Sequence, residues 1–64
     1  MKTLVLTTNN AKDINEFAYI IKWKETDAIY YAHQNYDYVY QEFAEKALNV
    51  FLRGEQNNYK FVIE

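Results

Sequence analysis

The chain has no cysteine and no proline, and it contains only one glycine and one histidine. Without cysteine there is no disulfide scaffold and no thiolate metal site. One histidine is too few for a His-rich metal centre or a catalytic histidine pair. Glycine-rich phosphate loops and dinucleotide fingerprints need glycine at several fixed positions, so both are excluded. The composition therefore predicts no metal and no cofactor.

Long apolar runs and an excess of positive charge are also missing. No run approaches the roughly 18 apolar residues of a membrane span, and no charged-then-apolar leader is recognisable. The formal net charge is −2, which argues against a general nucleic-acid binder. We therefore expect a cytoplasmic protein without membrane contact. The many Asn, Lys, Tyr and Ile residues are typical of a low-GC bacterium or its phages.

What is present is a short chain rich in aromatic side chains. Its 64 residues are 50% hydrophobic and 25% charged, which is too apolar for a disordered segment. The length predicts a single domain over residues 1–64. Seven tyrosines, four phenylalanines and one tryptophan each bury a large area for few lost rotamers. A monomer of this size is marginal, so pairing with a second copy would be a ready source of further burial.

Both ends of the chain have the pattern of a half-buried strand. In Lys2–Thr8, Leu4 and Leu6 alternate with threonine and valine. Residues 59–64 alternate in the same way, with aromatic and β-branched side chains on one side. A period of two in β-forming residues predicts a strand at each end.

A long helix is predicted over residues 36–53. Its apolar residues fall on one broad stripe at helical spacing: Tyr36, Val39, Tyr40, Phe43, Ala44, Ala47, Val50 and Phe51. The polar residues lie on the opposite side: Gln41, Glu42, Glu45, Lys46 and Asn49. Asn35 or Asp37 can cap the start, and Gly54 suits the left-handed conformation that ends many helices.

The middle of the chain fits two interpretations. Residues 17–24 and 28–33 have the alternation and residue types of strands. Residues 11–24 also match helical spacing, because Ile14, Phe17 and Ile21 recur three and four residues apart. We prefer strands.

The preferred fold is a small two-layer α+β domain with the order β-β-β-α-β. Its sheet would be mostly antiparallel and packed on the one long helix. The last strand would lie parallel to the first, since the intervening helix is a right-handed crossover. If residues 11–24 are helical, the order becomes β-α-β-α-β or β-α-α-β.

Catalytic residues are not apparent. His33 is predicted to lie at a strand end, satisfied by solvent or a neighbouring tyrosine. Glu42 and Glu45 share a helix face that we expect to meet water near Lys46. A carboxylate pair that works as acid and base needs burial or contrasting environments, and one helix on one sheet offers little room for them. The sequence predicts a protein that is not an enzyme.

Protein binding is the function that the remaining residues favour, either to another protein or to a second copy. Tyr38, Leu48 and Leu52 fall outside or at the edge of the apolar stripe and would widen the apolar surface of the helix. The sheet would also have two open edges, with no proline or bulge glycine to protect them. An added strand, from a second copy or a partner peptide, could pair there.

Single-stranded nucleic-acid binding is the alternative function. Lys22, Lys24 and Lys60 would project from the sheet face that the helix leaves open, together with either Tyr30 or Tyr31. Such a face can hold bases by stacking and phosphates by charge. The acidic net charge argues against this use, so nucleic acid is the less favoured partner.

Overall fold

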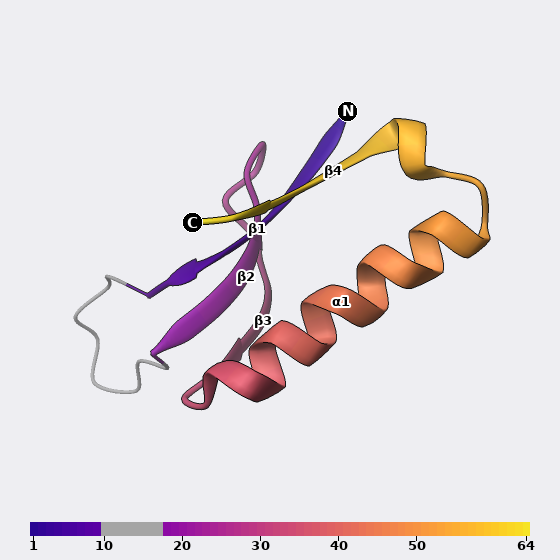
Figure 1. The fold of residues 1–64 in the computed structure, drawn as a ribbon. Helices are drawn as coiled ribbons and strands as arrows, with labels where there is room; N and C mark the ends of the chain where they lie inside the picture. Colours follow the sequence, from indigo (N-terminus) through magenta and orange to yellow (C-terminus); the bar gives the residue numbers. More distant parts are fainter. Residues whose placement is uncertain (10–17) are drawn as a thin grey trace.

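The computed structural model describes residues 1–9 and 18–64, which form one sheet and one helix (Figure 1). The elements in chain order are β1 (Lys2–Thr8), β2 (Tyr19–Trp23), β3 (Ile29–His33), α1 (Tyr36–Leu52), the short 3-10 helix η1 (Gln56–Asn58) and β4 (Tyr59–Ile63). The predicted α+β fold with the order β-β-β-α-β is confirmed.

The sheet has the strand order β3-β2-β1-β4. The β1–β2 and β2–β3 pairs are antiparallel, and β4 lies parallel to β1. Helix α1 packs on one face of this sheet and carries the chain from β3 at one edge to β4 at the other. The predicted parallel return of the last strand beside the first is therefore confirmed.

Within the predicted strand over residues 17–24, the structure forms a strand at Tyr19–Trp23, which is β2. The helical alternative for residues 11–24 is wrong over Tyr19–Trp23, and residues 11–17 lie outside the described part. In the strand, Tyr19, Ile21 and Trp23 all lie on the face that packs against the core. A helix would have spread these side chains around its axis, whereas a period of two places them on one face.

Helix α1 begins and ends with the expected chemistry. Asn35, rather than Asp37, is the N-cap, and its side chain accepts a hydrogen bond of 2.9 Å from the backbone N–H of Asp37. The helix ends at Leu52, with Arg53 as the C-cap. Gly54 follows with φ of +70°, a conformation that glycine adopts without a steric penalty.

The core lies between α1 and the two central strands. Leu4, Leu6 and Ile21 from the sheet pack against Val39 and Phe43 from the helix, and all five are buried. Partly buried aromatic side chains surround this cluster: Tyr19, Trp23, Tyr31 and Phe61. The aromatic residues therefore line the margin of the core more than its centre.

The apolar stripe of α1 is only partly covered, which corrects the prediction. Val39, Phe43 and Val50 are buried, but Tyr40 and Phe51 are 48% and 64% exposed. The helix packs mainly on β3 and β2 and makes fewer contacts with β1. A single helix on this part of the sheet covers a narrow stripe, so the flank that carries Tyr40 and Phe51 stays uncovered.

A bulge in β3 decides where its tyrosines lie. Ile21 pairs with Tyr31, but Lys22 pairs with Ile29, so Tyr30 is an extra residue between them. Tyr31 packs against the core, and the ring of Tyr30 contacts that of Trp23. Both tyrosines therefore lie on the helix side. The prediction that one of them shares the opposite face with the lysines is wrong, because the extra residue breaks the alternation.

Candidate interaction surfaces

The most exposed apolar side chains of α1 gather in its last two turns. Leu48, Phe51 and Leu52 are 55%, 64% and 71% exposed. Their spacing of three and four residues makes them neighbours on the helix surface. We call these three residues the helix-end patch. The sequence predicts Leu48 and Leu52 as part of this surface. It places Phe51 in the buried stripe, but the sheet covers a narrower part of the helix than that stripe.

Tyr38 does not belong to the helix-end patch. It lies in the first turn of α1, and its ring meets that of His33 edge-on at 4.7 Å between centroids. The His33 ring also stacks on Tyr31, and its Nδ1 accepts a hydrogen bond of 2.9 Å from the backbone N–H of Asn35. His33 thus fastens the β3–α1 connection, and the exposed ring of Tyr38 covers it.

The three predicted lysines do not join the helix-end patch either. Lys22 and Lys60 point to the sheet face opposite α1, and Lys24 follows β2 in the turn. The Lys22 ammonium forms an ion pair of 3.2 Å with Asp27. The six side chains singled out in the sequence therefore do not form one surface: Leu48 and Leu52 lie in the helix-end patch, and Tyr38 and the lysines lie elsewhere. The sheet face that carries Lys22 and Lys60 has neither Tyr30 nor Tyr31.

Lys46 lies among aromatic rings instead of in solvent, which is a further correction. Its Nζ is 5.9, 6.0 and 5.5 Å from the ring centroids of Trp23, Tyr30 and Tyr59. A signal for this position existed in the sequence. Lys46 follows Phe43 by three residues and precedes Val50 by four, so it shares their buried face. Because lysine is charged, the hydrophobic pattern alone does not assign Lys46 to that face.

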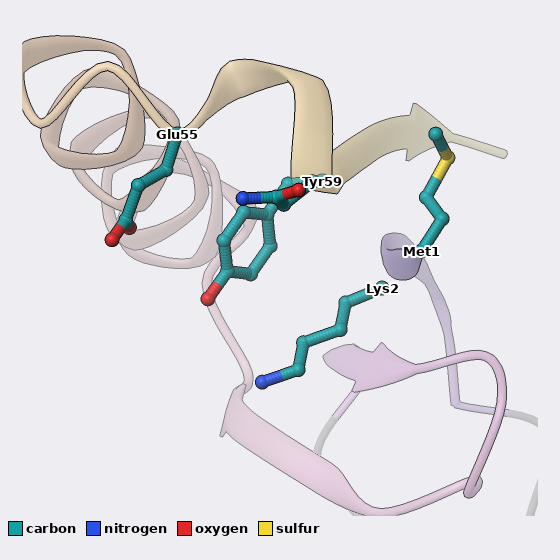
Figure 2. Close-up of a pocket in the computed structure, with 5 residues that line it drawn as sticks. Met1, Lys2, Glu55 and Tyr59 are labelled. Carbon is teal, nitrogen blue, oxygen red and sulfur yellow. The ribbon is translucent and has the colours of Figure 1, made fainter.

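Two open hollows have Lys2 in their linings. One, of about 320 Å³, is lined by Met1, Lys2, Glu55, Asn58 and Tyr59. Figure 2 shows Lys2 extending alongside Tyr59, and its Nζ lies 5.8 Å from the ring centroid. The neighbouring hollow, of about 300 Å³, is lined by Lys2, Trp23, Glu25 and Thr26. The linings of the two hollows combine Lys2 with two glutamates and two aromatic residues, Glu25 and Trp23 in one and Glu55 and Tyr59 in the other.

Glu25, which borders the second hollow, has a structural role. Its Oε1 accepts a hydrogen bond of 2.9 Å from the backbone N–H of Thr3. The backbone and side chain of Thr3 lower the pKa of this carboxyl below its ordinary value. The carboxylate thus ties the β2–β3 turn to the start of β1.

Within residues 1–9 and 18–64, no helix is long and apolar enough to cross a membrane. The same residues hold no group of three His, Asp or Glu side chains placed to bind a metal ion. Comparisons with family models, with curated proteins and with solved structures gave no match.

Proposed function

We propose that this protein is a small non-enzymatic protein-binding module whose contact surface is the helix-end patch. The observation that carries the proposal is the cluster of Leu48, Phe51 and Leu52, each more than half exposed on consecutive turns of one helix. Isolated apolar residues on a surface are ordinary, but a contiguous group is typical of an interaction site.

The surroundings of the patch support this function. Glu45 and Asn49 are exposed beside it, so the apolar centre has a polar rim. Protein interfaces commonly have this arrangement, in which a few apolar anchors are enclosed by groups that stay hydrated. A helix is also a rigid support, so little backbone conformational entropy is lost when its side chains dock. The fitting partner presents an apolar groove or a second amphipathic helix.

Three of the side chains that could perform chemistry already have structural partners, which also supports binding over catalysis. The Nδ1 of His33 is taken by the N–H of Asn35, and the carboxylate of Glu25 by the N–H of Thr3. Lys46 lies against three aromatic rings. We further propose, from the composition of the sequence, that the protein acts in the cytoplasm of a low-GC bacterium or of a phage-infected cell.

The structure lends little support to single-stranded nucleic-acid binding. Lys22 is paired with Asp27, and the stacking tyrosine it required lies on the helix side. Three lysines on an acidic protein are a weak basis for binding a polyanion.

The test is quantitative affinity capture with matched variants. Leu48→Glu with Leu52→Glu places two charges in the patch, and Gln34→Glu with Gln41→Glu adds the same charges at exposed positions outside it. We expect the wild-type protein and the Gln34/Gln41 variant to capture the same partner, and the Leu48/Leu52 variant to lose it. A partner that binds all three equally, or no partner at all, would contradict the proposal.

A further inference from the structure

Strand β4 forms one edge of the sheet and is regular over its whole length. It pairs with β1 in unbroken register from Tyr59 to Ile63. The other edge, β3, is interrupted by the bulge at Tyr30. A bulge twists an edge and hinders further pairing, whereas a flat edge without proline invites it. The β4 edge is therefore the one suited to receive another strand.

The backbone groups that β4 presents outward can be assigned. The N–H of Glu64 donates a hydrogen bond of 2.9 Å to the carbonyl of Leu6. The backbone N–H and C=O groups of every second residue before Glu64 therefore also point toward β1. These residues are Lys60 and Val62. The N–H and C=O groups of Phe61 and Ile63 consequently point away from the sheet, since successive residues alternate. No described strand pairs with them there.

The sequence of β4 is complementary to itself when two copies run antiparallel. With Val62 opposite Val62 of the second copy, Phe61 faces Ile63 and Lys60 faces Glu64. The Phe61–Ile63 pairs join residues whose outward groups are free, so each pair can exchange two backbone hydrogen bonds. Each Lys60–Glu64 pair places opposite charges directly across the strands, an arrangement that stabilises a sheet.

We propose that the protein forms a two-fold symmetric dimer through antiparallel β4–β4 pairing centred on Val62. The two four-stranded sheets then join into one continuous sheet, with both helices on the same face. Ile63, which is 53% exposed, and the half-buried Phe61 become covered at the junction. This inference goes beyond the proposed function, because it uses a different surface and does not require the helix-end patch to bind anything.

The charges distinguish this register from its neighbour. If the pairing were centred on Phe61, Lys60 would face Val62 and Glu64 would have no partner strand residue opposite it. Only the register centred on Val62 brings Lys60 and Glu64 together, and symmetry repeats that contact twice. A charge exchange between the two positions therefore tests both the dimer and its register.

The experiment is sedimentation equilibrium across the micromolar range at low salt. We expect the wild-type protein to reach a mass of twice 7.7 kDa. Lys60→Glu alone and Glu64→Lys alone should each weaken the dimer about tenfold, because like charges then face each other twice. The double variant with both changes should regain the wild-type dissociation constant. Circular dichroism on each variant verifies that the fold is kept.

Two controls separate this inference from the proposed function. Lys24→Glu changes the net charge as Lys60→Glu does, but away from the β4 edge, and should leave the dimer intact. The Leu48→Glu/Leu52→Glu variant should also stay dimeric. A wild-type monomer at every concentration, a double variant that is not rescued, or a dimer abolished by the helix-end changes would each overturn the inference.

Discussion

The ammonium group of Lys46 lies 5.5 Å from the centroid of the Tyr59 ring, on the side of α1 that packs against the sheet. The same ammonium approaches Trp23 and Tyr30, which come from β2 and β3. One helix side chain thus contacts aromatic rings from three strands. Beyond the buried core, this contact fixes the second half of α1 over the sheet.

Replacing Lys46 by glutamine should lower the free energy of unfolding by about 1 kcal/mol, because each ring face attracts the cation that glutamine lacks. Lys46→Glu should cost more, since a carboxylate is repelled by the same ring faces. Urea unfolding followed by circular dichroism measures both. The matched control is Lys24→Gln, in the exposed turn, where we expect a change within about 0.5 kcal/mol. Equal effects at the two lysines would disprove the role of the rings.

Phe43 and Phe51 allow a test of how α1 faces the sheet, since the same substitution is made twice on one helix. Phe43 is 5% exposed, so Phe43→Ala should cost about 3–5 kcal/mol through lost burial and a residual cavity. Such a loss would unfold much of a domain this small. Phe51→Ala removes a ring that is 64% exposed and should change stability by less than about 0.5 kcal/mol. Thermal unfolding of both variants decides, and the reverse order would mean that the helix is rotated.

Glu25 predicts a specific dependence of stability on pH. Its pKa is lowered in the folded state from an ordinary value of 4.5 by hydrogen bonding to Thr3. A lowered pKa means that the ionised carboxylate stabilises the fold above pH 4.5, and that this contribution is lost as the pH falls through the folded-state pKa. Glutamine in its place remains a neutral acceptor and does not titrate.

We therefore expect the wild-type protein to be more stable than Glu25→Gln at neutral pH, with the difference shrinking in acid. Unfolding curves for both proteins between neutral and acidic pH measure this difference. Glu55→Gln is the matched control, because Glu55 lies beside the other hollow and accepts no hydrogen bond from β1 in the described structure. If the difference in unfolding free energy between wild type and Glu25→Gln stayed constant with pH, the stabilising role of the Glu25 carboxylate would be refuted.

Much of the fold could be predicted because its elements are specified locally. The alternation around Leu4 and Leu6 leads to β1, and Asn35 and Gly54 enclose α1 with the expected cap and stop. The crossover rule then orders the last strand. The secondary structure of β2 does not follow from spacing alone, since the spacing of its apolar residues also fits a helix.

The candidate surfaces were less predictable, because they depend on how elements are rotated and offset. Periodicity groups Phe51 with Phe43, but only the helix's position over β3 and β2 leaves Phe51 exposed. Periodicity also separates Tyr30 from Tyr31, and the bulge places both on one side. The polarity of Lys46 predicts a solvent-exposed side chain, whereas the fold brings three aromatic rings from distant segments within contact of its ammonium group.

By itself, the sequence determined the order of strands and helix, where α1 starts and stops, and the absence of thiol and glycine-loop chemistry, since these follow from residue type and short-range spacing. Only the tertiary structure decided which apolar residues stay exposed and which charges meet rings or face one another. Those outcomes arise from a single helix that covers part of one sheet face, and from one inserted residue that shifts a strand by one position. No local pattern contains either offset.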